Sequence, residues 1–271
     1  MSGSWWSSPW ALGGIVAAAG AGIGAVAGVL SGRKKFNSED FGGFDDREDG
    51  DADLDPSIKR GRELIPGLIA QAGLPEDVGT FLNFVARGES GWVPTVGRGD
   101  PSLAPEGVKI NLDMSESRAA ATAYRRRADI FEACPHPPED YQFGSGGLFA
   151  ALPTYWLYHV RNTPLRCASP FEVFDPAFAI AGAYSFARGV SQHPAFEGNV
   201  RSLRAGWGSL NRMVKRSYDQ KLPKWRKHAN DLGLPASYID GPAPQFPKLD
   251  LLELYHSMGG ELALPGSAAV A

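Results

Sequence analysis

The sequence predicts a mainly helical domain that follows an apolar arm and an acidic linker. Apolar residues recur at helical spacing in residues 58–72 and 75–87, which predicts two helices with one buried face each. Residues 11–30 contain only apolar residues and glycine, whereas residues 38–56 are rich in Asp and Glu. With 271 residues, of which 43% are hydrophobic, the chain is long enough to bury one sizeable core beside such appendages.

Charge and cysteine usage exclude some classes of function and leave others open. The formal net charge is -3, so no global excess of positive charge points to nucleic acid as a partner. Two cysteines, Cys134 and Cys167, are too few for a disulfide framework, although one bridge would fit an oxidising compartment. A zinc site that combines them with His136 and His159 is the competing interpretation, but the usual short spacing of paired ligands is incomplete. We therefore expect no metal site.

The apolar arm has the features of a helix that packs closely against another helix. Residues 11–30 have about the length of 20 residues that crosses the core of a bilayer. Tryptophans precede the segment and basic residues follow it: Trp5, Trp6 and Trp10, then Arg33, Lys34 and Lys35. Glycine recurs every fourth residue, which clears one helix face for a second backbone: Gly20, Gly24, Gly28 and Gly32. A membrane helix, an arm ordered inside an assembly and a signal peptide are the three interpretations, and residues 11–32 are the expected contact with other copies or proteins.

Two further segments have too little apolar surface to form a core alone. Residues 38–56 carry nine acidic residues, so we interpret residues 37–57 as a linker. The alternative is that this segment is an acidic mimic that occupies a basic surface until it is released. Residues 233–271 form a tail rich in Pro and Gly that contains one short apolar run, residues 249–255. We expect the residues after that run not to be ordered on their own.

Three more segments predict helices. Residues 115–134 predict a helix with Ser115 as its N-cap, inside a stretch (97–143) that could be a surface helix, a groove wall or a docking element. Residues 170–190 are rich in Ala, Gly and Phe, which predicts a buried helix. Residues 211–232 are rich in Arg and Lys, which favours a solvated helix face, with binding of an anionic polymer as the alternative.

A carboxylate at the end of an apolar helix is the main candidate for chemistry. Residues 81–85 fit a buried helical face, and glycine and proline residues then end the helix beside Glu89. A carboxyl group among apolar side chains has its charged form disfavoured, so we expect Glu89 to hold a proton near neutral pH and to donate it. The competing interpretation is a solvated Glu in the last turn of a helix.

Four short blocks occur in order between residues 58 and 213. They read ESGWVP (89–94), SGGLFAALP (145–153), FDPAFAIAGAY (174–184) and SLRAGWGSL (202–210). In this order they resemble the E-S-G-x-x-P, S-x-G-L-M-Q-x-x-P, N-P-x-x-N-I-x-x-G-x-x-Y and, more weakly, A-Y-N-A-G-x-G-x-V signatures of the soluble lytic transglycosylases. Members of that family are lysozyme-like enzymes that cleave peptidoglycan.

The resemblance implies a fold and a set of site residues. The fold would be a lysozyme-like (goose-type or transglycosylase-type) helical domain over residues 58–232, after the arm (1–36) and the linker (37–57) and before the tail (233–271). Glu89 would be the catalytic residue, and no cofactor is implied. The residues expected to bind the glycan strand are Ser90, Ser145, Gly147, Leu148, Phe149 and Tyr184, with Tyr184 facing the catalytic carboxyl.

The chain departs from the family at polar positions that normally orient the sugar. Ala150 replaces a Gln, Ala179 an Asn, and Leu203 with Arg204 a Tyr-Asn pair. Loss of these polar groups would make the site slow, change its specificity or inactivate it.

If the resemblance holds, the reaction cleaves peptidoglycan between N-acetylmuramic acid and N-acetylglucosamine. Glycosidases commonly use two carboxylates, whereas this family needs only one. Glu89 would protonate the leaving oxygen and then take the proton of the sugar's own 6-hydroxyl, which closes on the anomeric carbon to give a 1,6-anhydro end. Asp100, which follows Gly99, is the alternative second carboxylate if the chain is a hydrolase.

Three classes of function stay open on this basis. The first is a phage virion protein that opens the host wall locally during genome entry and acts at the periplasm, with residues 11–32 contacting other virion proteins or a membrane. The second is a weak or inactive lysozyme-like structural or ejection protein of a virion. The third is a membrane-anchored enzyme that remodels the wall of its own cell. Presence of the protein in purified virions discriminates the first two from the third.

Overall fold

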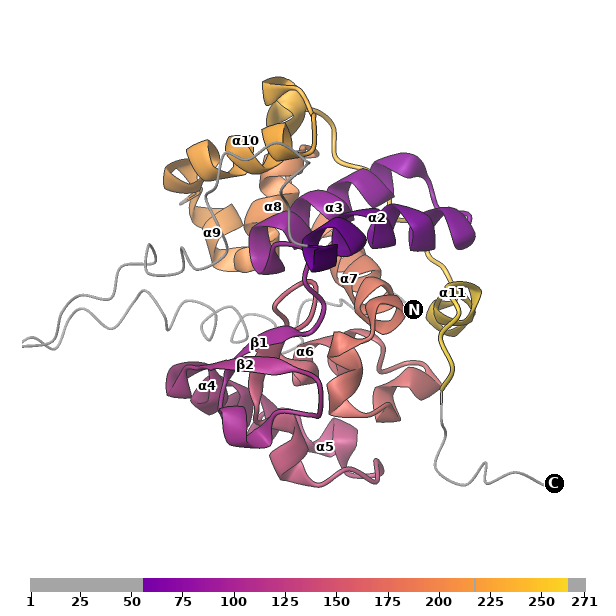
Figure 1. Ribbon diagram of the computed structural model, residues 1–271. Coiled ribbons are helices and arrows are strands. Elements are labelled where there is room, and N and C mark those ends of the chain that lie inside the picture. Colours follow the sequence, from indigo (N-terminus) through magenta and orange to yellow (C-terminus); the bar gives the residue numbers. More distant parts are fainter. Residues whose placement is uncertain (1–55, 217, 263–271) are drawn as a thin grey trace, which may run out of the picture.

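The computed structural model describes residues 56–216 and 218–262, which form a mainly helical domain with one small sheet (Figure 1). This confirms the predicted mainly helical class. The predicted arm (1–36) and the predicted linker (37–57), apart from its last two residues, lie outside the described residues, so both stay predictions. Within the described part of the chain, no helix is long and apolar enough to cross a membrane.

A helical hairpin opens the domain, as the periodicity of residues 58–87 predicts. Helices α2 (Pro56–Gln71) and α3 (Glu76–Ser90) pack against each other, and the turn between them contains Gly73 at a φ of +65°. The apolar face of α3 is fully buried, including Phe81 and Phe84. Burial of this face determines how α3 is oriented, and therefore where its last turn lies.

A three-stranded sheet follows α3, and nothing in the sequence predicts it. Strands β1 (Val96–Gly99), β2 (Lys109–Leu112) and β3 (Gly144–Gly146) lie in the order β2-β1-β3, with β1 parallel to β2 and antiparallel to β3. A Cβ on Gly99 would lie 1.7 Å from the carbonyl oxygen of Phe143, so the strands approach as only glycine allows. Glycine makes up half of β1 and most of β3, and β2 is only four residues long, so the β-branched and aromatic residues that signal a strand are few.

The helix predicted over residues 115–134 is two helices with a different N-cap. Helix α4 (Met114–Arg125) is capped by Asp113, whose carboxylate accepts hydrogen bonds from the backbone N–H groups of Ser115 and Glu116. The predicted cap, Ser115, lies inside the first turn, because the aspartate one step before the helix supplies the acceptor and a favourable negative charge. Helix α5 (Ala128–Phe131) is a single turn that follows a break in helical geometry.

The remaining helices are arranged around α7 (Pro176–Ser191). Helix α7 contacts α2, α6 (Pro153–His159), α8 (Val200–Gly208) and α11 (Leu251–Ser257). The buried helix predicted over residues 170–190 begins only at residue 176, because a 3-10 turn precedes it and Asp175 caps it.

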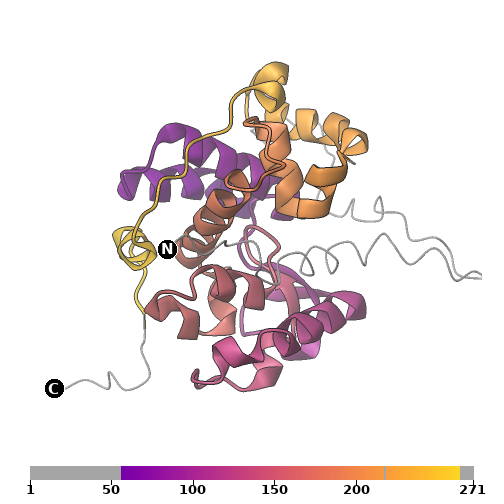
Figure 2. The same ribbon diagram turned by 180° about the vertical axis from the view of Figure 1, so that it is seen from behind.

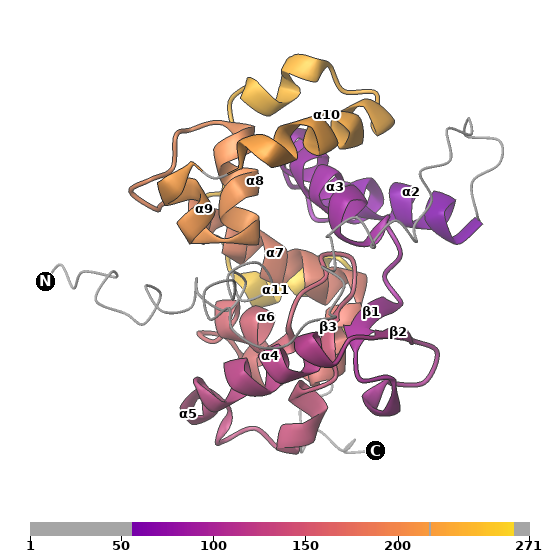
Figure 3. The same cartoon turned by 90° about the vertical axis from the view of Figure 1, so that its left-hand side faces the viewer.

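The basic segment predicted to present a solvated helix face contains two helices. Helix α9 (Leu210–Lys215) ends at Arg216, which has a left-handed φ of 50°, and α10 (Leu222–Asp231) follows. Trp225 is buried while its basic neighbours in α10 are exposed, so the prediction of a solvated face is confirmed for this helix. Helices α8, α9 and α10 lie at one end of the molecule and α4 and α5 at the other, with α7 between them (Figure 3).

The segment after residue 232 belongs to the domain, so the predicted boundary of the tail was wrong. Ile239, Phe246 and Tyr255 are buried in the main apolar core. The segment runs along one side of the molecule and ends with α11 beside α7 (Figure 2). Residues without a helical pattern of their own are ordered here by the apolar surface that they cover, and a local pattern does not reveal that surface.

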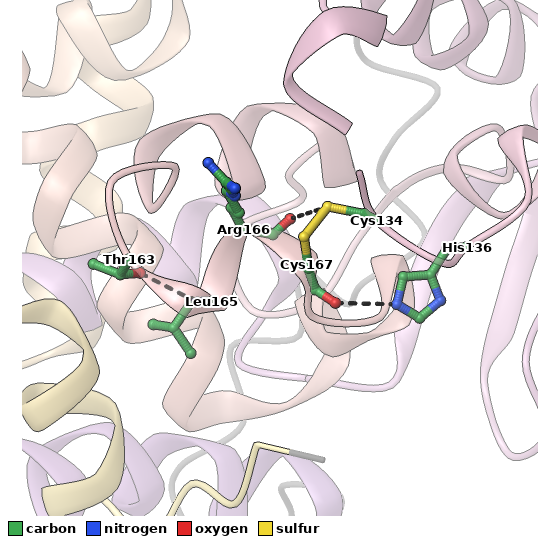
Figure 4. Close-up of a disulfide and its surroundings, with 6 residues drawn as sticks. All are labelled: Cys134, His136, Thr163, Leu165, Arg166 and Cys167. Atoms are coloured by element: carbon green, nitrogen blue, oxygen red, sulfur yellow. Dashed lines mark hydrogen bonds between the residues drawn. A yellow bond between two sulfur atoms is a disulfide. The ribbon is translucent and has the colours of Figure 1, made fainter. Parts of the chain in front are cut away.

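A disulfide joins Cys134 to Cys167 (Figure 4). Nε2 of His136 lies 3.2 Å from the carbonyl oxygen of Cys167. The Cys134 sulfur lies 3.7 Å from the carbonyl oxygen of Arg166. The bridge connects the chain after α5 to the turn after α6. It also takes both thiolates that the zinc alternative requires, and among the residues that the structure describes no group of three or more His, Cys, Asp or Glu could hold a metal ion.

Replacing both cysteines by serine is expected to lower the free energy of unfolding by about 3–4 kcal/mol, because the bridge closes a loop between positions 33 residues apart and so restricts the unfolded chain. Urea denaturation of the parent and of the Cys134→Ser/Cys167→Ser variant measures this difference. Dithiothreitol should bring the parent to the stability of the variant and leave the variant itself unchanged. Equal stability of parent and variant without reductant would contradict the prediction.

Candidate active site

Glu89 is the last residue but one of α3, at the point where the chain leaves the helix for β1. Gly91 adopts a left-handed conformation (φ 60°), and its N–H donates to the carbonyl oxygen of Ala86. Trp92 also has a positive φ of 68°, and its indole N–H donates to Oδ1 of Asn83 at 2.7 Å. These bonds hold the reversal of the chain in place. The Glu89 side chain is left 27% exposed, so a ligand can reach it from solvent.

Arg204 of α8 binds the Glu89 carboxylate. Its Nη2 lies 2.5 Å from Oε1 of Glu89, although the two residues are 115 positions apart. The Arg204 side chain is only 7% exposed and its guanidinium group lies over the ring of Trp225. Because a buried charge requires an opposite charge, each member of this pair holds the other in place. The sequence signal that could have located the pair is a lone Arg among small and apolar residues in the fourth block.

Helix α10 packs against the same end of α3. A Cβ on Gly88 would lie 2.8 Å from Nδ1 of His228 and 3.1 Å from Nη2 of Arg204, so glycine allows both side chains to approach the helix. Arg87 and Asp231 form an ion pair at 2.8 Å that ties α3 to α10. Burial, with Arg204 and Arg87 adding to it, lowers the pKa of His228 to about 3. The imidazole is therefore neutral at neutral pH.

The free energy of unfolding is expected to fall as the pH drops from about 6.5 towards 3. In the unfolded chain His228 takes up a proton near its ordinary pKa, whereas the folded chain excludes that proton until the pH reaches about 3. The stabilisation is therefore complete above the unfolded pKa and is lost as the pH falls. His159, whose pKa is also lowered to about 3 by burial, acts in the same direction. Each histidine contributes at most about 1.4 kcal/mol per pH unit.

Urea denaturation between pH 7 and pH 4 tests this expectation. The free energy of unfolding should change less steeply with pH for His228→Gln than for the parent. The two slopes should differ by at most the effect of one bound proton, about 1.4 kcal/mol per pH unit. His256→Gln, at an exposed histidine, is the matched control and should follow the parent. The same slope for the parent and for His228→Gln would show that His228 is not the group involved.

The turn after β3 lies against the last turn of α3. The Ser90 hydroxyl donates to the carbonyl oxygen of Leu148 at 2.9 Å, so the turn that Gly147 begins is joined to the residue next to Glu89. Leu148 and Phe149 are 0% and 3% exposed and pack in the core. Their side chains therefore support the turn and do not face a ligand, which differs from the role that the resemblance implies. Ser90 is also buried, with its hydroxyl occupied.

Tyr184 and Asp100 have structural roles. The Tyr184 hydroxyl donates to the carbonyl oxygen of Pro247 at 3.0 Å and so holds the C-terminal segment, whereas the resemblance implies that it faces Glu89. Burial raises the pKa of Tyr184 to about 12. The Asp100 carboxylate caps a short 3-10 turn by accepting hydrogen bonds from the N–H and the hydroxyl of Ser102, which lower its pKa. Capping accounts for an acid at this position without any catalytic role.

A carboxyl group that no sequence motif contains lies beside the site. Glu116 of α4 is hydrogen bonded to the side chain of Ser145, and Glu89 is near enough to act on its charge. Burial raises the pKa of Glu116; Asp113 and Glu89 add to the rise, while Arg98 and Ser145 oppose it. No pattern in the sequence indicates Glu116, because only the packing of α4 on β3 brings it to this place.

Three of the four positions at which the chain departs from the transglycosylase blocks carry apolar side chains. Leu203 and Ala179 are buried in the core, and the carbonyl oxygen of Ala179 accepts a hydrogen bond from the indole of Trp156 at 3.0 Å. Ala150 adopts a left-handed conformation (φ 47°) in the turn after β3. The fourth departure is Arg204, which occupies the carboxylate itself.

We refer to Glu89, Arg204, Glu116 and Ser145 as the Glu89 site. It combines a partly exposed carboxylate, a buried guanidinium group and a second carboxyl group held by a hydroxyl. In comparisons with known proteins, the chain matches no protein-family model, no curated protein and no solved structure. The chemistry of the Glu89 site is therefore the guide to what the domain does.

Proposed function

We propose that the domain has a lysozyme-like fold and cleaves the glycan strands of peptidoglycan between N-acetylmuramic acid and N-acetylglucosamine. The observation that carries this proposal is the convergence of three of the four sequence blocks around one carboxylate. The first block meets the second through Ser90 and Leu148, and it meets the fourth through Glu89 and Arg204. These contacts join parts of the chain that are 58 and 115 positions apart.

Glu89 is the group that carries the proton transfers in this proposal. A protonated carboxyl gives its proton to the glycosidic oxygen as the bond to the anomeric carbon breaks. The resulting carboxylate then takes the proton of the sugar's 6-hydroxyl while that oxygen bonds to the anomeric carbon, which leaves a 1,6-anhydro end. The partial exposure of Glu89 at the end of a buried helix is consistent with both steps. The reaction uses no cofactor.

The setting that we propose is a phage virion protein that acts on the wall in the host periplasm during genome entry. Three features support it: the apolar arm with its glycine repeat, the acidic linker, and a disulfide, which persists in oxidising compartments such as the periplasm. Residues 11–32 would contact other virion proteins, further copies or a membrane. A membrane-anchored enzyme of a bacterial envelope is the alternative setting, and detection of the protein in purified virions separates the two.

A second candidate function is a catalytically inactive lysozyme-like component of a virion. The observation that favours it is the ion pair itself, because Arg204 occupies one oxygen of Glu89, the residue that the resemblance implies as the catalytic acid. The alanines and leucine at the other altered positions would leave the sugar with fewer hydrogen-bond partners. In that case the domain would keep its fold as a scaffold, without turnover.

Incubation of the full chain with purified peptidoglycan, followed by mass spectrometry of the released ends, tests these proposals. Release of 1,6-anhydromuramic acid ends supports the transglycosylase reaction. Reducing muramic acid ends support hydrolysis of the same bond. No release from chain that is shown by circular dichroism to be folded would exclude the proposed activity and favour the scaffold.

A further inference from the structure

Glu116 is held in a defined position by the sheet below the end of α3. It lies in the first turn of α4, next to the cap Asp113, which forms an ion pair with Arg98 of β1 at 2.9 Å. Arg98 is paired across the sheet with Ser145 of β3, so their side chains project from the same face. Ser145 is 6% exposed and its side chain is hydrogen bonded to the Glu116 carboxyl. Glu116 is thus fixed from the helix and from the sheet.

The surroundings of Glu116 favour its protonated form. Burial raises its pKa, and the negative charges of Asp113 and Glu89 add to this effect against the opposing Arg98 and Ser145. Glu89 has a different environment, because a guanidinium group lies directly on its carboxylate. Two neighbouring carboxyl groups in such unlike surroundings are the usual arrangement for a general acid and its partner base.

The buried guanidinium group of Arg204 also has an incomplete set of hydrogen bonds. The Arg204 side chain is 93% buried, as its exposure of 7% shows, yet its Nε has no hydrogen-bond partner among the described residues. Nearly all buried polar groups are paired, so the described residues do not complete the hydrogen bonding of this guanidinium group. The donor and the two carboxyl groups belong to different elements, α8, α3 and α4.

We propose that Glu116, positioned by Ser145, is a second catalytic carboxyl group and acts with Glu89 on the same glycosidic bond. This inference rests on the proposed function and deepens it, because it divides between two residues the proton transfers that a single acid would perform in turn. It also replaces Asp100, which caps a turn, as the second carboxylate.

The Glu116 carboxylic acid gives its proton to the glycosidic oxygen, and the bond from that oxygen to the anomeric carbon breaks with both electrons going to the oxygen. A hydroxyl oxygen, from the sugar's own C6 or from water, bonds to the anomeric carbon and gives its proton to the Glu89 carboxylate. A proton then returns from Glu89 to Glu116 through solvent, so the two groups end as they began.

The experiment compares the full chain with its Glu116→Gln variant on two substrates. Peptidoglycan has a sugar leaving group that needs a proton, whereas a 4-methylumbelliferyl chitooligosaccharide has a phenol leaving group that does not. Glu116→Gln should lose about 100- to 10,000-fold on peptidoglycan and much less on the aryl glycoside. Ser145→Ala should show a weaker loss with the same preference between substrates, since it removes only the group that positions Glu116.

A control and a titration keep the possible results distinguishable. Glu106→Gln, at an exposed carboxylate in the loop before β2, should match the parent on both substrates. Carboxyl carbon NMR of the labelled full chain, with the Glu116 signal assigned by its loss in Glu116→Gln, should show a pKa above the ordinary glutamate value.

Several results would overturn the inference. If the parent cleaves peptidoglycan and Glu116→Gln cleaves it equally well, Glu116 is structural while the proposed function stands. An equal loss on both substrates would exclude its role as the proton donor. If the folded parent cleaves neither substrate, the proposed function fails and the catalytic role of Glu116 fails with it. An ordinary pKa in the titration would contradict the acid role separately from any activity.

Discussion

Glu89→Gln is expected to reduce the release of glycan ends from peptidoglycan by about 100- to 10,000-fold, the usual contribution of a general acid or base. The amide keeps the shape of the side chain and an oxygen that can accept the hydrogen bond of Arg204, but it cannot exchange a proton. The loss should occur with peptidoglycan and with the aryl glycoside, because Glu89 takes the proton of the attacking hydroxyl in either case. This pattern differs from the one expected for Glu116→Gln.

The measurement is the initial rate of end release, quantified by mass spectrometry, for the parent, Glu89→Gln and the exposed control Glu106→Gln. Thermal unfolding followed by circular dichroism must accompany it, because Glu89 is the ion-pair partner of a buried guanidinium group. Parent-like rates for a folded Glu89→Gln would remove Glu89 from the mechanism. They would leave Glu116 as the next residue to examine.

Gly147→Ala is expected to lower the free energy of unfolding by about 2–5 kcal/mol, since it adds a steric clash to a strained backbone. Gly147 has a φ of +75°, and a Cβ there would lie 1.9 Å from the carbonyl oxygen of Val173. Backbone atoms move less readily than side chains, so the turn between β3 and α6 would have to shift. Because Leu148 in this turn accepts the hydrogen bond of Ser90, cleavage of peptidoglycan should fall as well.

Gly107→Ala is the matched control for this variant. Gly107 has nearly the same φ, +78°, but a Cβ there would meet no atom within 4 Å. Urea denaturation should therefore show only the cost of the left-handed backbone, about 1–2 kcal/mol. Equal losses for the two variants would show that the close approach to Val173 contributes nothing.

The elements that the sequence predicted well are those whose signal is local. The apolar face of α3, with Phe81 and Phe84, repeats at helical spacing, and that spacing alone places Glu89 at the end of a buried helix. The sheet had no such signal, because the facing positions of β1 and β3 are mostly glycine. The segment 233–262 was misjudged for a related reason, since its order depends on a surface made by other helices.

The amino-acid sequence alone is enough to indicate a helical domain, a carboxylate at the end of one helix and four ordered blocks that resemble a known enzyme family. The groups that contact this carboxylate depend on how the helices and the sheet pack together. Arg204 reaches Glu89 from α8, and Glu116 reaches Ser145 from α4. Neither pair is set by spacing along the chain: α7 and the core determine how far α8 lies from α3, and the glycine-lined sheet determines where α4 packs. Contacts of this kind follow from how elements fill space together, which no single stretch of sequence encodes.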